Sequence, residues 1–188
     1  GIELFVEPIS NDGGTAIGAA LLYYHSINKS DLRRPREIYL GPEYDYADQE
    51  ILDLASKYNG IVTDATHADV IELMTSKNIV ANFQGRSESG PRALGNRSLM
   101  FDPTFEDGKD FVNEIKHREY FRPFAGSILE EDVHEWFDLR GMEDSPHMMY
   151  AVNCQPGIAE KIPSIIHVDG SCRIQTVTRE QNPHYYDI

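Results

Sequence analysis

The stretch from Gln84 to Ser98 constrains this chain more than any other part of its sequence. It reads Gln-Gly-Arg-Ser-Glu-Ser-Gly-Pro-Arg-Ala-Leu-Gly-Asn-Arg-Ser and follows a short apolar segment, residues 78–83. A strand that delivers such a loop presents guanidinium and backbone N–H groups together, which is how a fold forms a socket for phosphate or carboxylate oxygens. The alternative is an ordinary charged surface loop, which would not need glycine and proline to fix the backbone around its arginines.

A second basic segment follows at residues 116–124, Lys-His-Arg-Glu-Tyr-Phe-Arg-Pro-Phe. In an extended backbone Lys116 and Arg118 point the same way, and a lysine beside an arginine fork suits adjacent phosphoryl and carboxyl groups. The alternative is a helix end whose cations favour the negative pole of the helix. Arg122 and the neighbouring aromatic residues exceed what a helix terminus requires.

The charge distribution favours a small anionic ligand. The net charge of −14 argues against unspecific attraction to nucleic acid or to an anionic membrane. Residues 86–122 nevertheless hold seven Lys or Arg against seven Asp or Glu, so this segment is neutral within an acidic protein. Local basic side chains of this kind match a small anion better than a polyanion.

Length and composition are those of a soluble globular protein. The 188 residues, 40% of them hydrophobic, can bury one substantial core. No apolar run is long enough to span a bilayer, and residues 1–4 lack the features of a signal peptide, so we expect a cytoplasmic location. Cys154 and Cys172 lack metal-site spacing and are expected to be free thiols.

Hydrophobic patterning predicts an α/β protein in which strands and helices alternate. We expect strands at residues 4–6, 37–40, 61–62, 79–83, 99–101, 125–129 and 148–152, and two strands within 165–177 broken by Asp-Gly-Ser. Helices are expected at 15–28, 47–58, 65–76 and 106–115, with a short one around 133–137. Residues 138–146 read as a mobile polar loop, and 31–36 as a linker at a domain boundary.

Polar residues near the end of the chain invite two interpretations. His167 and Asp169 suit a metal or acid–base site, or alternatively a satisfied strand histidine and the first residue of a turn. Ser171 has no nucleophile elbow around it, so its expected role is a hydrogen bond to bound phosphate. There is no Walker A or Rossmann fingerprint, so ATP would need another scaffold.

Together these segments resemble the C-terminal domain of the carbamoyltransferase family, which includes nodulation protein U and enzymes that carbamoylate antibiotics. The resemblance covers about residues 37–188. It is carried by three motifs in order: Gly85-Arg86-x-Glu88-x-Gly90-Pro91-Arg92-Ala93-Leu94-Gly95-Asn96-Arg97-Ser98, then Asn113-x-x-Lys116-His117-Arg118-Glu119-x-Phe121-Arg122-Pro123-Phe124, then His167-Val168-Asp169-Gly170-Ser171-x-Arg173-x-Gln175-x-Val177.

Residues 1–30 are similar to the tail of the family's N-terminal domain, which is related to actin-like ATPases. On local evidence Asp12 is a turn or capping residue, but the resemblance implies that in the complete enzyme it helps to hold a divalent metal, Fe²⁺. The metal-binding histidines of that domain have no counterpart here. We therefore expect no competent metal site in this chain.

For residues 37–188 the resemblance implies a YrdC-like fold, a twisted mixed sheet with flanking helices. Such domains convert carbamoyl phosphate and ATP, with Mg²⁺, into carbamoyl adenylate and pyrophosphate, and the N-terminal domain passes the carbamoyl group to an acceptor hydroxyl. Lys116, Arg118 and Ser171 would be catalytic. The substrate- and nucleotide-binding residues would be Arg86, Arg92, Asn96, Arg97, Arg122, His167, Asp169 and Arg173.

The roles implied by analogy are specific. Lys116, Arg118 and Arg122 would hold phosphates or the carbamoyl carboxylate, Arg92 the other end of the adenylate, and Ser171 a phosphate oxygen. This chemistry needs positioning and charge neutralisation and has little need of a covalent nucleophile. One departure, at residues 125–127, replaces the more usual second proline and affects local backbone shape.

Two other classes of function remain open. One is an RNA- or nucleotide-binding module, since YrdC-like folds present a basic concave face; the net charge, and the lack of exposed aromatic platforms beside basic strips, argue against it. The other is a catalytically silent scaffold domain, against which the intact Lys116, Arg118 and Ser171 speak.

Overall fold

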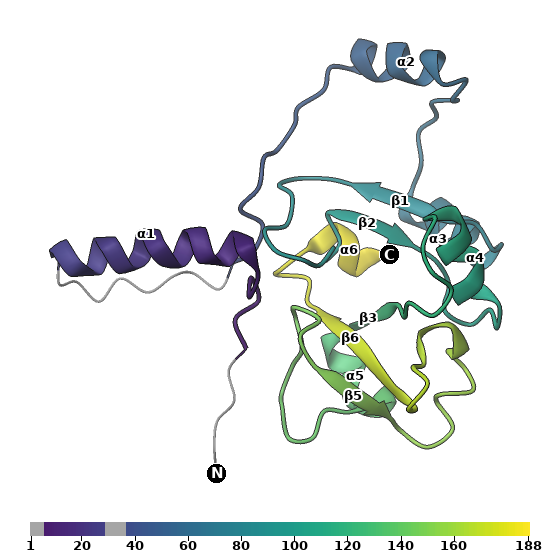
Figure 1. Ribbon diagram of the computed structural model, residues 1–188. Helices are drawn as coiled ribbons and strands as arrows, with labels where there is room; N and C mark the ends of the chain where they lie inside the picture. The colour runs from purple at the N-terminus through teal and green to yellow at the C-terminus, as the bar shows by residue number, and fades with distance from the viewer. Residues whose placement is uncertain (1–5, 29–36) are drawn as a thin grey trace.

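The computed structural model describes residues 6–28 and 37–188, and these form a mixed α/β structure (Figure 1). The expected strand at 4–6 falls almost wholly outside the described residues, and so does the expected linker at 31–36. In the described part no helix is long and apolar enough to cross a membrane.

A four-stranded mixed sheet is the main framework. Its strands are β3 (Ala125–Leu129), β4 (Phe137–Asp138), β5 (Ala151–Cys154) and β6 (Ser171–Val177), in the spatial order β3-β6-β5-β4. β3 and β6 are parallel, and the remaining neighbours are antiparallel. Strand β6 lies between β3 and β5 and is buried on both faces at its C-terminal half.

One face of this sheet is covered by the core of the protein. The short helix α5 (Val133–Trp136) packs there, preceded by the 3₁₀ turn η1 (Glu130–Asp132). The fully apolar side chains meet in one cluster that closes this face: Val133, Phe137, Leu139, Val152, Ile158, Ile162, Ile165, Cys172 and Ile174.

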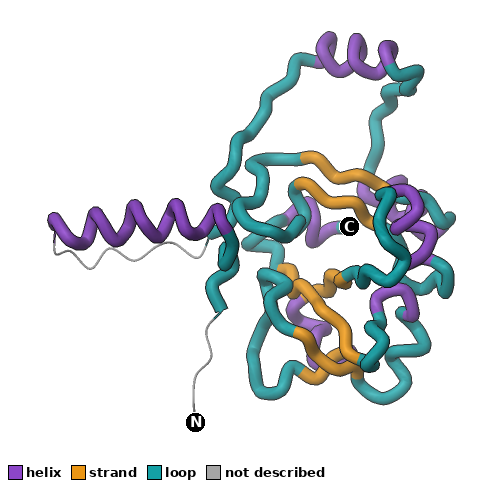
Figure 2. Tube along the Cα trace, in the orientation of Figure 1, coloured by secondary structure: helices purple, strands orange, loops and turns teal. Residues whose placement is uncertain are grey.

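A second layer lies across the other face (Figure 2). It contains the antiparallel pair β1 (Val80–Phe83) and β2 (Arg97–Met100), with α3 (His67–Thr75) and α4 (Gly108–Ile115) beside it. The last helix, α6 (Pro183–Asp187), enters between the two layers. The arginine-rich loop joins β1 to β2 and contacts the four-stranded sheet, where its Leu94 carbonyl accepts a hydrogen bond from Gln175 of β6.

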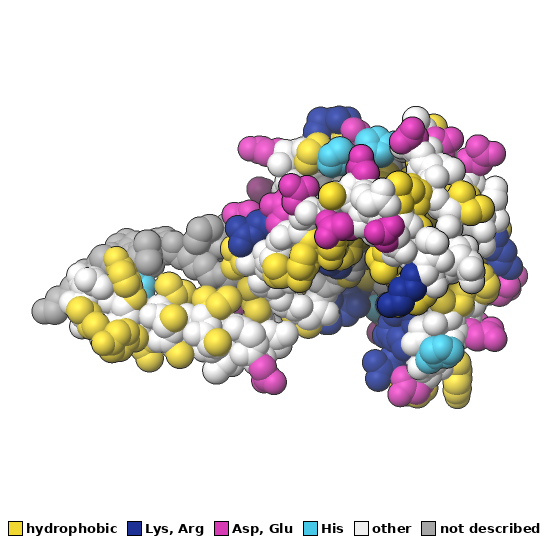
Figure 3. Space-filling view, turned by 90° about the horizontal axis from the view of Figure 1, so that it is seen from above, with side chains coloured by type: hydrophobic (Ala, Val, Ile, Leu, Met, Phe, Trp, Pro, Cys, Tyr) yellow, Lys and Arg dark blue, Asp and Glu magenta, His cyan; other side chains and the backbone are white. Residues whose placement is uncertain are grey.

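Two helices stand away from this body. α1 (Asp12–Asn28) and α2 (Asp48–Lys57) contain no buried residue. Apolar side chains lie along α1 (Figure 3), and Tyr23 near its far end is 70% exposed. A helix that is apolar on most sides is normally covered, so α1 has the composition of a helix that packs against something else.

Several expected elements differ from the observed ones. Residues 37–40 and 61–62 form no strand; Ile38 is buried instead by packing with Leu94 and Met148. Residues 163–165 form the 3₁₀ turn η2 (Pro163–Ile165) and a further turn precedes β6, so the last region holds one strand where two were expected. Pro163 at the start of η2 and Gly170 in the following turn explain why no strand forms before β6.

The polar segment 138–146 is anchored at two points and does not form the freely mobile loop that its composition predicts. Leu139 is buried in the core, and Ser145 is 1% exposed. The Ser145 N–H donates to Thr176 Oγ1 at 3.0 Å, and its hydroxyl donates to the Ile174 carbonyl at 3.0 Å. These bonds tie the segment to the central strand.

The buried face of β6 predicts the largest stability effect. Replacing Ile174 with Ala should lower the free energy of unfolding by about 2–5 kcal/mol, because it removes apolar contacts and leaves a cavity. Denaturant unfolding followed by circular dichroism measures this. Ile51→Ala, at a half-exposed position of the outlying α2, should change the value by less than about 0.5 kcal/mol. Equal effects of the two changes would contradict the assigned core.

Candidate functional site

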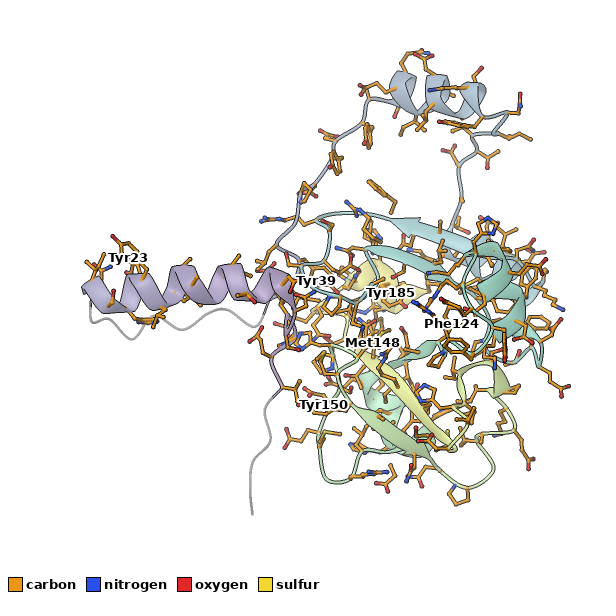
Figure 4. All side chains as sticks on the ribbon, viewed as in Figure 1. Tyr23, Tyr39, Phe124, Met148, Tyr150 and Tyr185 are labelled. Carbon is orange, nitrogen blue, oxygen red and sulfur yellow. The ribbon has the colours of Figure 1, made fainter. Side chains whose placement is uncertain are left out.

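A cavity of about 720 Å³ lies between the two layers. This volume is within the range of about 300–1,000 Å³ that is usual for ligand sites. Figure 4 shows Phe124, Met148 and Tyr185 gathered in this space. The cationic side chains that line it come from the β1–β2 loop and β2, the end of α4, and β6: Arg92, Arg97, Lys116, Arg118 and Arg173.

The backbone of the arginine-rich loop is shaped by its own glutamate. Glu88 Oε1 accepts hydrogen bonds from the backbone N–H groups of Leu94 at 2.6 Å, Asn96 at 2.9 Å and Arg97 at 3.3 Å. These N–H groups were expected to form part of an anion socket, and that expectation is wrong for them. An internal carboxylate takes the place of an external anion and holds the loop closed.

Two of the three arginines in this loop are used within the fold. Arg86 donates to the Gly41 and Leu40 carbonyls at 3.0 and 2.9 Å. Arg97 donates to the Gln84 carbonyl at 2.6 Å and stacks on the Phe83 ring at 3.7 Å. Their predicted role in ligand binding remains untested, but most of their donors are already satisfied.

Arg92 differs from these two arginines. It lines the cavity, and its Nε is buried with no hydrogen-bond partner. Asn96, another predicted binding residue, is buried beneath the loop, where its Nδ2 donates to the Arg86 carbonyl at 2.7 Å and its Oδ1 accepts from Asn182 at 2.8 Å. Among the three arginines of this loop, Arg92 therefore differs in having a buried Nε without a hydrogen-bond partner.

Lys116 and Arg118 reach the cavity from the end of α4, where the backbone is not extended as we expected. Lys116 is the C-cap, and His117 adopts a left-handed conformation with φ of 49°. The His117 N–H donates to the Glu114 carbonyl and the Arg118 N–H to the Asn113 carbonyl, which is the Schellman pattern. The sharp turn nonetheless leaves both cations lining the cavity, with Arg118 5.3 Å from the Phe124 ring centre.

The cations that line the cavity lie near one another. Burial lowers the pKa of Arg173, and the nearby Arg92 and Arg118 lower it further. Burial also lowers the pKa of Lys116, with Arg118 adding to the effect. Among the described residues none of these four forms an ion pair with a carboxylate, and the Nε of Arg173 is buried without a partner. Such an arrangement favours a bound anion.

The predicted residues around the third motif lie beside the cavity. Ser171 donates to Asp169 Oδ1 at 2.7 Å, and His167 Nδ1 is 3.2 Å from the Ser171 hydroxyl. These three residues do not line the cavity, although Ser171 shares a face of β6 with Arg173, two residues on. Bonding to Ser171 lowers the pKa of Asp169. Arg122 also points elsewhere and pairs with Glu119 at 2.6 Å.

Asp12 is the exposed first residue of α1. The preceding Asn11 caps this helix, because its Oδ1 accepts from the Gly14 N–H at 3.4 Å, so Asp12 is not the cap that local evidence favoured. Within residues 6–28 and 37–188 no group of three or more His, Cys, Asp or Glu side chains is arranged to hold a metal ion.

The two cysteines are free, as expected. Their sulfur atoms lie 3.8 Å apart across β5 and β6, and burial raises the pKa of Cys172 to about 12. A thiol with such a pKa stays protonated and behaves as a small apolar group.

Three residues of the site were missed by sequence reasoning. Glu88 belonged to the quoted motif, but nothing in its spacing indicated that it would bind the loop's own backbone. Ser127 and Tyr185 line the cavity with a hydroxyl–hydroxyl distance of 2.7 Å. They lie 58 residues apart in the chain, so no local pattern reveals their contact.

Comparison with known proteins agrees with this description. The family model described as "Carbamoyltransferase C-terminus" matches residues 71–188. Nodulation protein NolO of Bradyrhizobium diazoefficiens is 37% identical over 99% of this chain and 35% of its own length. Nodulation protein NolNO of Sinorhizobium fredii is 38% identical over 99% and 28%, and nodulation protein U of Rhizobium tropici 35% identical over 94% and 29%.

The fold and the cavity define a mixed α/β protein with a cation-lined pocket between two layers. The chain belongs to the carbamoyltransferase family, and its residues 71–188 match the model of the family's C-terminal part. It spans about a third of the length of the curated relatives it matches.

We predict that the cations of the cavity lower the stability of the fold but are needed for anion binding. Arg173→Met removes a desolvated charge and keeps an unbranched chain, so the free energy of unfolding should rise by about 0.5–2 kcal/mol. Pyrophosphate should raise the thermal midpoint of the wild type, since a ligand stabilises the state it binds, but not that of the variant. Arg179→Met, at an exposed arginine paired with Asp187, should leave the pyrophosphate response intact. An equal response in Arg173→Met would contradict the assignment of the anion site.

Proposed function

We propose that this chain is the part of a carbamoyltransferase that binds carbamoyl phosphate and ATP and forms carbamoyl adenylate. Carbamoyl phosphate, ATP and one water then yield carbamoyl adenylate, pyrophosphate and inorganic phosphate. Water bonds to the phosphorus of carbamoyl phosphate and the bond from that phosphorus to the bridging oxygen breaks, which gives inorganic phosphate and carbamate. A carbamate oxygen then bonds to the α-phosphorus of ATP, and the bond from the α-phosphorus to the oxygen that bridges to the β-phosphate breaks, so that pyrophosphate leaves. The complete enzyme would pass the carbamoyl group to an acceptor hydroxyl.

The observation that carries this proposal is a set of cations around one cavity that form no ion pair with any carboxylate of the described residues. Both substrates are anionic, and the reaction brings a carbamate against a phosphate, so the main task is charge neutralisation and alignment. Arg92, Lys116, Arg118 and Arg173 supply positive charge from three separate segments. Asp102 is the acidic side chain among the described lining residues, and it accepts a bond from the Thr104 N–H at 2.9 Å.

The residues take distinct roles in this proposal. Lys116 is a mobile point charge, while the forks of Arg92 and Arg173 hold two oxygens each and Arg118 adds a third fork. Ser171 lies beyond Arg173 on the same strand face, and its hydroxyl donates to Asp169. It would have to turn its hydrogen away from Asp169 before it could donate to a phosphate oxygen at the edge of the site. Arg122 would have to leave Glu119 before it could contribute.

Mg²⁺ would arrive as the complex with ATP, because no described cluster of side chains is built to bind it alone. Fe²⁺ likewise has no cluster of ligands among the described residues. An exposed Asp12 on its own does not fit a metal site, so no step of the proposed reaction within this chain uses iron.

We further propose that residues 37–188 form a YrdC-like domain and that residues 1–30 belong to a neighbouring domain related to actin-like ATPases. Two observations support the division. The match to the family model begins at residue 71, well after α1. α1 itself buries none of its apolar side chains against the described residues.

An RNA-binding role is favoured by one feature that our sequence analysis did not expect. Tyr44 and Tyr46 are exposed and stack at 5.8 Å, with Phe83 tilted at 6.2 Å from Tyr44 and Arg97 over Phe83. No exposed aromatic platform beside basic residues was expected from the sequence, but this cluster places exposed aromatic rings beside an arginine. The donors of Arg97 are taken by backbone carbonyls, however, and the tyrosines alternate with Glu43 and Asp45, which repel a phosphate backbone.

The proposed activity is tested by pyrophosphate release without an acceptor. The chain should release pyrophosphate from ATP only when carbamoyl phosphate and magnesium are both present. Lys116→Ala should lower this rate by about 100-fold, because it removes a charge that contacts the reacting groups. Lys57→Ala, on the outlying α2, loses the same charge and should keep the wild-type rate. An unchanged rate in Lys116→Ala would remove this lysine from the mechanism.

A further inference from the structure

The cavity wall carries a chain of neutral hydrogen bonds beside the cations. The Tyr185 hydroxyl lies 2.7 Å from that of Ser127, and the Ser127 hydroxyl lies 3.4 Å from Gln175 Oε1. The side-chain nitrogen of Gln175 donates to the Leu94 carbonyl at 3.1 Å. Tyr185 and Ser127 both line the cavity, so this chain begins at the ligand space and ends inside the fold.

The direction of this chain follows from its inner end. A backbone carbonyl only accepts, so Gln175 must turn its nitrogen to Leu94 and its oxygen to Ser127. The Ser127 hydroxyl then donates to that oxygen, and the Tyr185 hydroxyl donates to Ser127. Leu94 also accepts from the Tyr39 hydroxyl at 2.9 Å, which fills its remaining lone pair. The Tyr185 oxygen therefore has its hydrogen engaged and offers only lone pairs to the cavity.

This acceptor lies close to the cations. In the parallel register of β3 and β6, Ser127 pairs with Gln175 and Ala125 pairs with Arg173, so both rows share one face of the sheet. Arg173 is therefore the diagonal neighbour of Ser127 on this face. The ring of Tyr185 rests on Gly95, where a Cβ atom would be 2.7 Å from the ring. The tyrosine is thus held in place beside an anion site.

Resting on the function proposed above, we propose that Tyr185 determines specificity for the carbamoyl group by accepting a hydrogen bond from its amino group. In carbamoyl phosphate the nitrogen is joined to phosphorus through one carbon and one oxygen, so the amino group stays near the bound phosphate. The adenine amino group is separated from the phosphates by the ribose and the ring. Acetyl phosphate, which carries a methyl group in place of the amino group, gains nothing from an acceptor at this position.

Selectivity between carbamoyl phosphate and acetyl phosphate tests this role. Tyr185→Phe keeps the ring and removes the acceptor. Its kcat/KM for carbamoyl phosphate in pyrophosphate release should fall about tenfold, while the value for acetyl phosphate should not change. A purely structural fault would lower both values together. Ser127→Ala frees the Tyr185 hydrogen, turns the phenol into a possible donor, and should reduce the same selectivity.

Matched measurements separate the outcomes. Tyr58→Phe loses an exposed hydroxyl outside the cavity and should retain wild-type selectivity. Calorimetric binding of carbamoyl phosphate and acetyl phosphate should show the same loss in Tyr185→Phe without relying on turnover. An active wild type with unchanged selectivity in Tyr185→Phe overturns the inference and leaves the proposed function standing. A changed preference for ATP over inosine triphosphate would assign Tyr185 to the adenine amino group and overturn it too. A wild type that neither binds carbamoyl phosphate nor releases pyrophosphate refutes both proposals.

Discussion

The carboxylate of Glu88 holds the loop on which the rest of the site depends. Three backbone N–H groups converge on one of its oxygens, and charge-assisted bonds of this kind are roughly twice as strong as neutral ones. With the loop closed, Arg86 and Arg97 are drawn onto backbone carbonyls, and Asn96 is buried below them. Arg92 lines the cavity, and its buried Nε has no hydrogen-bond partner among the described residues.

The cations that line the cavity destabilise the fold electrostatically. Burial lowers the pKa of Arg173, and Arg92 and Arg118 stand close enough to lower it further. A fold selected for stability alone would pair these charges or replace them with apolar residues. Their retention in a cavity of ligand size is the physical reason to assign the site an anionic ligand, independently of any relative. The family match then narrows the chemistry of that ligand.

Sequence reasoning located the site better than it described it. The periodicity of residues 106–115 and 125–129 predicted α4 and β3. The clustered basic residues marked segments from which Arg92, Lys116 and Arg118 line the cavity. The prediction of an extended backbone at Lys116 and Arg118 was wrong, because His117 adopts a left-handed conformation that ends the helix. Glycine is the residue that usually signals this conformation in a sequence, and histidine does not. The anchoring of Ser145 and the contact of Ser127 with Tyr185 depend on partners far along the chain, which local patterns do not contain. The mostly polar segment 138–146 was therefore predicted to be mobile, although three hydrogen bonds join Ser145 to β6.

The cationic and the neutral parts of the cavity are linked through Leu94. Its N–H donates to Glu88, and its carbonyl ends the hydrogen-bond chain that begins at Tyr185. One carboxylate therefore positions both Arg92, which neutralises charge, and the carbonyl that orients Gln175 and Ser127. An anion is held by charge whatever else it carries, so charge alone cannot distinguish carbamoyl phosphate from other acyl phosphates. The oriented chain adds a neutral acceptor at a fixed place, and its geometry is set by the same loop that presents the charge. Affinity and specificity in this pocket thus share one structural origin, so a change that loosens the loop should weaken both together.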